Sequence, residues 1–205
     1  PSIMPGGDPA AYAEVEEVLT GIAAVVDDTP CCVHVGPGGA GHYVKMVHNG
    51  IEYGLMAAYA EGYELLMAKE IVKDVPGAFK AWSRGTVVRS WLLDLLVDAL
   101  EQNPGLKDVS GYTTDSGEGR WTVIEGVENA VPMPVISAAL FSRFTSRQEN
   151  SPAMQAVAAL RGGFGGHEVM TFGDEPWGRP KQVHQAAEPA DTEGEATPGA
   201  VDDEA

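Results

Sequence analysis

Cysteine is scarce in this chain. Its 205 residues include two cysteines, and these are the adjacent Cys31 and Cys32. Neighbouring cysteines make poor structural disulfides, and no histidine stands at a spacing that would complete a metal site with them. The sequence therefore predicts a domain that folds without disulfide or metal, in a reducing, cytoplasmic compartment.

Positive charge and long apolar runs are also in short supply. Thirteen lysines and arginines face 30 acidic residues, and the formal net charge of −17 argues against nucleic acid or an anionic membrane as a partner. An anionic small molecule stays compatible with this balance, because a local pocket can reverse the sign of the global charge. No apolar run approaches the ~20 residues of a membrane span, and no signal-peptide apolar region is present. Because the chain begins at Pro1 and not at methionine, we interpret it as a fragment or a processed product.

The C-terminal segment is poor in apolar side chains. Residues 181–205 carry one lysine against seven acidic residues, among many alanines, prolines and glycines. Such a composition cannot bury enough apolar surface to offset the entropy lost on ordering. We expect residues 176–205 to form a disordered, solvated acidic tail, with a functional acidic tail as the less favoured alternative.

Helical signals are abundant and strand signals are few, so the predicted fold class is all-α. Asp8 followed by Pro9 is typical of a helix start, and the pattern predicts a helix to about Asp27. An extended connector, Thr29–Gly39, leads to the longest helical signal, Ala40–Glu70. Further helices are predicted over Val75–Arg84, Val87–Gln102, Thr122–Asn129, Pro134–Gln148 and Ser151–Leu160, and the glycine-rich residues 161–170 are expected to be extended.

Glycines mark two features of the long helix. Gly50, Gly54 and Gly62 each cost roughly 1 kcal/mol against alanine within a helix. We expect close helix packing at these positions, with close ligand approach as the alternative. The glycine-rich run 36–41 precedes the helix, but Pro37 removes one N–H that could face a phosphate. We interpret this run as a helix-initiating turn, although the helix N-terminus could hold an anion.

Polar residues share one face of the long helix. Lys45, His48, Asn49 and Glu52 stand at offsets of 0, 3, 4 and 7. A solvated polar face with an i,i+4 pair is one interpretation. An acid–base site is the other, because the flanking apolar residues predict partial burial, and a buried lysine near a glutamate has the shifted proton affinity that acid–base chemistry needs.

Five stretches of the chain resemble one known family. They are PSIMPGGD (1–8), GPGGAGHYVKMVHNGIEYGLM (36–56), DSGEGRWTVIEG (115–126), FSRFTSRQE (141–149) and RGGFGGHEV (161–169). The family is that of the decarboxylating 6-phosphogluconate dehydrogenases, in its short subfamily. The resemblance covers roughly residues 1–170 and is near-continuous over 36–56, which makes it far more specific than a lone glycine motif.

This resemblance implies the family's multi-helix C-terminal domain, with a long central helix. Residues 1–39 would form an N-terminal loop, first helix and connector, and residues 40–175 the helical substrate-binding and dimerisation domain. The implied activity is oxidative decarboxylation of 6-phosphogluconate to ribulose 5-phosphate with NADP or NAD, in the pentose phosphate pathway. The implied assembly is a homodimer with an exchanged C-terminal segment. We expect the N-terminal dinucleotide-binding domain to be absent and the chain alone to be inactive.

The resemblance also implies site residues. Lys45 matches the general base, which must be neutral to accept a proton, and Glu52 the general acid. The implied substrate-binding residues are His48, Asn49, Tyr53, Ser116, Arg143, Arg161 and His167. Asn49 would also lie near the nicotinamide, and Arg161 and His167 would close the site of a neighbouring subunit. We expect Lys45, Asn49 and Glu52 to project into a pocket shared with Arg143.

One loop departs from the longer family members, which carry Lys-Gly-Thr-Gly for the phosphate. Here Ser116 stands in place of the lysine, and Glu118 adds an acid. Two other functions stay open: a non-catalytic helical dimerisation module, and a related β-hydroxyacid dehydrogenase domain. Arg161 and His167 weigh against the last of these, because such a pair suits a phosphate-bearing ligand.

Overall fold

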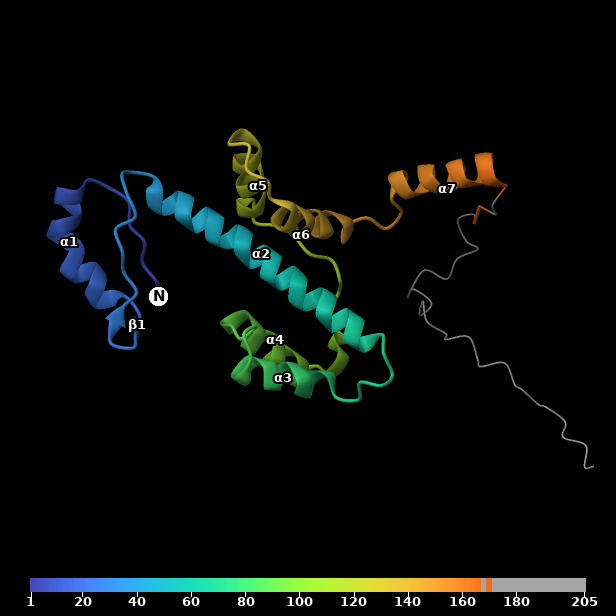
Figure 1. The fold of residues 1–205 in the computed structure, drawn as a ribbon, viewed down its shortest axis with the longest axis horizontal. Helices are drawn as coiled ribbons and strands as arrows, with labels where there is room; N and C mark the ends of the chain where they lie inside the picture. Colours follow the sequence, from blue (N-terminus) through green and yellow to red (C-terminus); the bar gives the residue numbers. More distant parts are fainter. Residues whose placement is uncertain (167–168, 171–205) are drawn as a thin grey trace, which may run out of the picture. The chain divides into compact units, whose positions relative to one another are not determined.

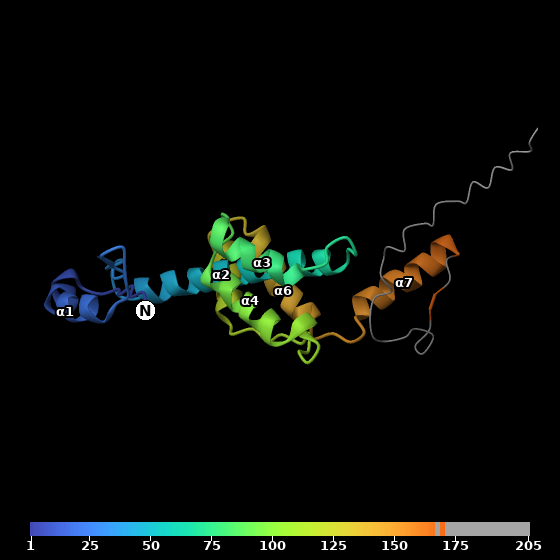
Figure 2. The same ribbon diagram turned by 90° about the horizontal axis from the view of Figure 1, so that it is seen from below.

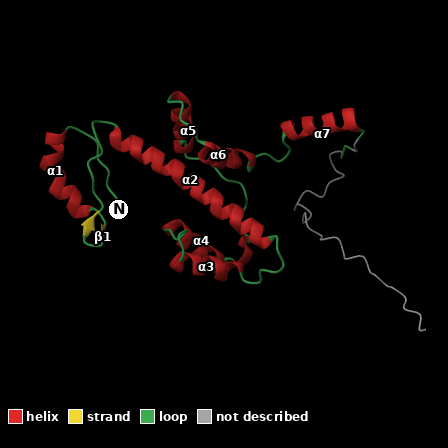
Figure 3. Cartoon of the chain, viewed as in Figure 1, coloured by secondary structure: helices red, strands yellow, loops and turns green. Residues whose placement is uncertain are grey.

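The computed structural model describes residues 1–166 and 169–170, and every element named below belongs to the unit of residues 1–167. Helices dominate the described chain (Figure 3), which confirms the predicted all-α class. The elements are α1 (Pro9–Ile22), β1 (Val25–Val26), β2 (Thr29–Pro30), α2 (Ala40–Met67), α3 (Val75–Gly85), α4 (Trp91–Gln102), the short 3-10 turn η1 (Pro104–Leu106), α5 (Glu118–Glu128), α6 (Pro134–Thr145) and α7 (Pro152–Gly165). None of the helices in the described ranges is both long and apolar enough to cross a membrane.

Helix α2 is the element around which two helix pairs pack. Figure 1 shows α5 and α6 on one side of α2 and α3 and α4 on the other, and in Figure 2 the second pair covers the middle of α2. The α3–α4 side buries Val75, Phe79, Leu93 and Val97 against Tyr63 and its neighbours on α2. Burying each large side chain contributes about 1.5–3 kcal/mol.

The α5–α6 side has a smaller core that includes a site residue. Tyr53 of α2 is buried with Ala139 and Leu140 of α6. Because Tyr53 is held in this core, its hydroxyl is directed to one place on the neighbouring loop. The core therefore fixes one end of the candidate site.

Side-chain caps explain where three helices begin. The Asp8 carboxylate accepts hydrogen bonds from the amides of Ala10 and Ala11, at 2.9 and 3.1 Å, so the helix start expected there is confirmed. Asp74 and Ser90 cap α3 and α4 in the same manner. Each such cap stabilises its helix by about 1 kcal/mol.

The first helix ends earlier than predicted. It stops at Ile22 and not near Asp27, because Ala23 already leaves the helical region with ψ of 156°, and Asp27 and Asp28 then adopt left-handed backbone angles, with φ of 47° and 58°. Aspartate tolerates this region better than most residues, since its short side chain bonds locally. The chain thereby turns back into the β1–β2 hairpin, in which Val25 pairs with Pro30.

Other helix boundaries also differ from the sequence prediction. Helix α2 ends at Met67 and not at Glu70, and α4 begins only after its cap at Ser90, while α5 begins earlier than predicted, at Glu118. Helix α7 continues through residues 161–165 to a left-handed Gly166, so the expectation of an extended segment there was wrong. The predicted acidic tail, residues 176–205, lies outside the described residues, as does His167.

Helices α2 and α5 approach each other closely at a glycine. A Cβ atom on Gly50 would lie 2.7 Å from Cγ2 of the buried Thr122, and one on Gly119 would lie 2.5 Å from the Tyr53 ring. Gly54 meets Val135 of α6, whereas Gly62 faces open space. Close packing is therefore confirmed for two of the three α2 glycines, and it brings the first turn of α5 against α2.

Candidate active site

The four polar residues of α2 meet on one side of the helix. The ammonium of Lys45 donates to Oδ1 of Asn49 and lies 3.4 Å from Nδ1 of His48. His48 Nδ1 in turn lies 3.9 Å from a carboxylate oxygen of Glu52. The structure thus joins Lys45, His48, Asn49 and Glu52 through direct contacts, as their spacing indicated.

This face is more open than the sequence predicted. Lys45 and His48 are exposed, while Asn49 and Glu52 are half-buried. The expectation of partial burial is therefore wrong for Lys45. Two of the flanking apolar residues are themselves open to solvent, with Ile51 53% and Leu55 43% exposed.

Glu118, which the sequence analysis treated only as a departure from the longer family members, is bonded to the residues of α2. The amide nitrogen of Asn49 donates to Oε2 of Glu118, and Ser116 Oγ donates to the same oxygen at 3.3 Å. Glu118 is the first residue of α5, where the helix dipole favours a carboxylate. No local pattern pairs it with Asn49, since the two positions are 69 residues apart in sequence.

Tyr53 and Ser116 extend this set of hydrogen bonds. The Ser116 amide donates to the Tyr53 hydroxyl at 3.0 Å, and the two hydroxyl oxygens are 3.3 Å apart. Because the Ser116 hydroxyl proton is directed to Glu118, the Tyr53 hydroxyl donates to Ser116. A continuous series of bonds therefore runs from Lys45 through Asn49, Glu118 and Ser116 to Tyr53.

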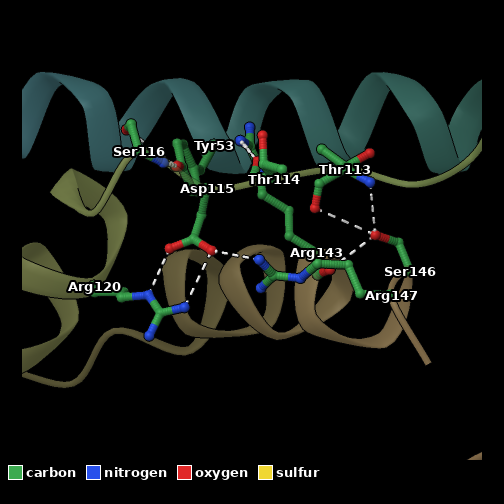
Figure 4. Close-up of polar contacts among 9 residues, drawn as sticks. All are labelled: Tyr53, Thr113, Thr114, Asp115, Ser116, Arg120, Arg143, Ser146 and Arg147. Atoms are coloured by element: carbon green, nitrogen blue, oxygen red, sulfur yellow. Dashed lines mark hydrogen bonds and ion pairs between the residues drawn. The ribbon is translucent and has the colours of Figure 1, made fainter.

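Arg143 lies at the far end of this series. Its guanidinium carbon is 3.5 Å from the centroid of the Tyr53 ring, and Nη1 donates to the Thr114 carbonyl at 3.0 Å (Figure 4). In the described part of the chain no carboxylate forms an ion pair with Arg143. Its positive charge is therefore available to an anion.

The other two arginines nearby are already paired. Asp115, whose side chain is 4% exposed, binds Arg120 at 2.5 Å and Arg147 at 2.9 Å (Figure 4). The hydrogen bond from Arg120 is the main cause that lowers the pKa of Asp115 to about 2, Arg147 adds to it, and desolvation opposes it. Asp115 thus neutralises much of this local positive charge and fixes the loop that carries Ser116.

Within the described residues, the cavity at Lys45 does not extend to Arg143. An open cavity of about 500 Å³ touches Lys45, but its lining comes from residues 2–6 and 39–45 and does not include Arg143. Arg143 instead covers Tyr53, about two turns further along α2, and the hydrogen bonds through Asn49, Glu118 and Ser116 join the two ends. No group of metal-ligating side chains occurs among the residues whose structure is described.

The two C-terminal site residues are not brought to this place within the described chain. Arg161 is exposed on α7, a helix without a buried residue. His167 lies outside the described residues. The site formed by this unit therefore comprises Lys45, His48, Asn49, Glu52, Tyr53, Ser116 and Arg143, together with the unpredicted Glu118.

Comparison with known proteins identifies the family. The family model described as "6-phosphogluconate dehydrogenase, C-terminal domain" matches residues 41–175. The chain belongs to this family. The resemblance noted in the sequence is thereby confirmed, and the fold and the site can be set beside those of named relatives.

Two relatives and one solved structure illustrate the similarity. The NAD(+)-dependent, decarboxylating 6-phosphogluconate dehydrogenase of Haloferax volcanii is 43% identical over 169 residues, covering 82% of this chain and 56% of the relative. The Bacillus subtilis enzyme of the same description is 38% identical over 170 residues, covering 78% of this chain and 36% of the relative. Plasmodium falciparum 6-phosphogluconate dehydrogenase, in a study of its apo form and its complexes with NADP+ and with 6-phosphogluconate, superposes with a TM-score of 0.63 at 31% identity, covering 84% of this chain and 38% of that one. The chain thus spans between about a third and just over half of the length of these proteins.

Proposed function

We propose that this chain is the substrate-binding helical domain for the oxidative decarboxylation of 6-phosphogluconate to ribulose 5-phosphate with NAD or NADP. The observation that carries the proposal is the series of hydrogen bonds from Lys45 to Tyr53, on whose ring the uncompensated Arg143 lies. It joins Lys45, the candidate base, to Arg143, the cation that would bind the substrate phosphate. The substrate offers matching groups, with a phosphate at one end and a carboxylate at the other.

The phosphate end is built around Arg143. A guanidinium binds phosphate through two parallel charge-assisted hydrogen bonds, and stacking on Tyr53 holds its plane in place. The hydroxyls of Tyr53 and Ser116 lie beside it as further hydrogen-bonding groups. The Glu118 carboxylate is occupied by Asn49 and Ser116, which reduces its repulsion of the phosphate.

The chemistry lies at the other end. Lys45, in its neutral form, takes the proton of the C3 hydroxyl, and its ammonium then stabilises the negative charge that develops on that oxygen as carbon dioxide leaves. Glu52 delivers a proton to the carbon that has lost the carboxylate. His48 and Asn49 hold the substrate hydroxyls. Each positioned proton transfer contributes about 10²–10⁴-fold to the rate.

NAD or NADP, when bound, supplies the acceptor for the hydride of C3. The residue of this chain that fits a contact with the nicotinamide is Asn49, because its amide already touches Lys45 and so belongs to the reacting end of the site. The cofactor's phosphates and adenosine would be held elsewhere, in a dinucleotide-binding domain.

A homodimer with an exchanged C-terminal segment is part of the proposal, and so is a cytoplasmic location. Helix α7 has no buried residue in this single chain, yet it exposes an apolar stripe of Met154, Val157, Leu160 and Phe164 at helical spacing. A second subunit would cover this stripe. Arg161 and His167 would then reach the site of the other subunit.

Turnover by the protein expressed from its complete gene tests the proposal. We expect 6-phosphogluconate-dependent reduction of NAD or NADP with release of carbon dioxide. Lys45→Met should abolish turnover and leave cofactor binding intact, while Lys69→Met, an exposed lysine beyond the end of α2, should behave as wild type. Turnover near the native rate in Lys45→Met would overturn the catalytic assignment, and a wild-type protein without turnover would favour the non-catalytic module.

A further inference from the structure

Asn49 is a side chain whose orientation is set by its two neighbours. An ammonium only donates hydrogen bonds and a carboxylate only accepts them. Since Lys45 and Glu118 lie on opposite ends of the amide, its oxygen must face Lys45 and its nitrogen must face Glu118. In the opposite orientation the NH2 group of Asn49 would face the Lys45 ammonium, donor against donor. Its oxygen would face the Glu118 carboxylate, acceptor against acceptor.

Glu118 also sets the direction of the bonds on its other side. The same carboxylate oxygen accepts the Ser116 hydroxyl, which leaves the Tyr53 hydroxyl to donate to Ser116. Every hydrogen bond between side chains in the series therefore runs towards Glu118. Among the described residues of the series it is the group that carries a negative charge, so it determines how all the others point.

We propose that Glu118 is a positioning residue for the proton transfer, because it holds the Asn49 amide in the orientation that fixes the amine of Lys45. This inference rests on the proposed function, in which Lys45 is the base. It goes beyond that function by giving a role to a residue that does not touch the substrate. Glu118, the acid by which this loop differs from that of the longer family members, thereby belongs to the reacting end of the site.

The packing of α5 on α2 supports this role. Thr122, one turn after Glu118, is 1% exposed, and its hydroxyl lies 2.9 Å from the Met46 carbonyl and 2.8 Å from the Glu118 carbonyl. The close contact at Gly50 lets α5 come this near. The backbone of Glu118 is therefore held against α2, and its side chain reaches Asn49 from a fixed base.

Charge gives the role a measurable signature. Lys45 is surrounded by His42 and His48 of α2, by Glu52 behind His48, and by Glu118 of α5 through Asn49. The N-terminal residues 2–6 that line the adjoining cavity add no titratable side chain. Removing the negative charge of Glu118 makes it easier for the Lys45 ammonium to lose its proton, so the acidic limb of the rate profile should move to lower pH.

Two variants of Glu118 test the proposal in the complete protein. Glu118→Gln keeps the shape and an oxygen that accepts from Asn49, but it removes the charge. Glu118→Ala removes the acceptor as well. We expect kcat to fall about tenfold or more in Glu118→Ala with a smaller change in KM. Glu118→Gln should retain more of the rate, with its acidic limb displaced to lower pH.

Glu128→Gln is the matched control, because Glu128 is exposed at the far end of the same helix, about 15 Å away along its axis. This variant should reproduce the wild-type rate and pH profile. A wild-type pH profile in Glu118→Gln together with an unchanged kcat in folded Glu118→Ala would overturn the positioning role. A rise in KM alone would do the same, by confining Glu118 to the phosphate end. Absence of turnover in the wild type would instead overturn the proposed function, so the two failures are distinguishable.

Discussion

The guanidinium of Arg143 stacks on the ring of Tyr53, with 3.5 Å between the guanidinium carbon and the ring centroid. The two residues come from α6 and α2, so this contact links the helices as well as orienting the arginine. Arginine suits such a position, because its flat cation lies on an aromatic face while its edge stays free for a planar or tetrahedral anion. Arg143 therefore joins the small core to the proposed phosphate site.

Replacing Arg143 should weaken substrate binding more than it slows the reaction. We expect Arg143→Ala to raise KM for 6-phosphogluconate by about ten- to a hundredfold, the equivalent of one charged hydrogen-bonding group, with a smaller effect on kcat. Arg89→Ala, on the exposed loop before α4, is the control and should leave both constants unchanged. Steady-state kinetics on folded variants decides the matter, and an unchanged KM in Arg143→Ala would show that the arginine does not bind the phosphate.

Two glycines of α2 should respond to alanine with opposite signs. At Gly50 the new Cβ would lie 2.7 Å from the stiff, β-branched Thr122 side chain, and such overpacking costs about 1–3 kcal/mol, more than the roughly 1 kcal/mol gained in helix propensity. At Gly62 the Cβ meets open space, so only the gain remains. Thermal or urea unfolding should therefore give a lower stability for Gly50→Ala and a higher one for Gly62→Ala. Equal effects at the two positions would contradict the close contact between α2 and α5.

Periodicity was sufficient to predict the helical class, the long central helix and the common face of Lys45, His48, Asn49 and Glu52. These features depend on residues that are near in sequence, where a 3.6-residue repeat relates position to direction. The cap at Asp8 was predictable for the same reason. Local chemistry determines these parts of the structure.

Tertiary contacts determine the remainder. The bond between Asn49 and Glu118 spans 69 residues, and it exists because Gly50 and Thr122 allow α5 to approach α2. No spacing rule relates such positions, so Glu118 was recognised only as an unexpected acid. The extension of α7 through residues 161–165 was missed because glycine has a low helix propensity, which the surrounding alanine-rich sequence overrides.

The apolar stripe of α7 provides a test of the proposed homodimer. Leu160 is 66% exposed in the single chain, and a charge at that position should prevent a second subunit from covering the helix. We expect Leu160→Asp to shift the protein from dimer to monomer in analytical ultracentrifugation. Gln155→Asp, on an exposed and already polar position of the same helix, should remain dimeric. If Leu160→Asp also remained dimeric, α7 would not form the interface.

The ion pairs of Asp115 should make stability depend on pH in the acid range. The Arg120 and Arg147 guanidiniums lower the pKa of Asp115 from 3.8 to about 2, so the folded protein binds this proton less readily than the unfolded chain. The stabilisation is therefore fully present above the unfolded value of 3.8 and is lost as the pH falls through about 2.

Asp115→Asn lacks the charge at every pH. The difference in Tm between the wild type and Asp115→Asn should be constant near neutrality and should shrink between these two pH values. Asp98→Asn, an exposed residue of α4, should show no such difference. If the difference for Asp115 were unchanged at the acid end, the two arginines would stabilise the loop by a means other than the carboxylate charge.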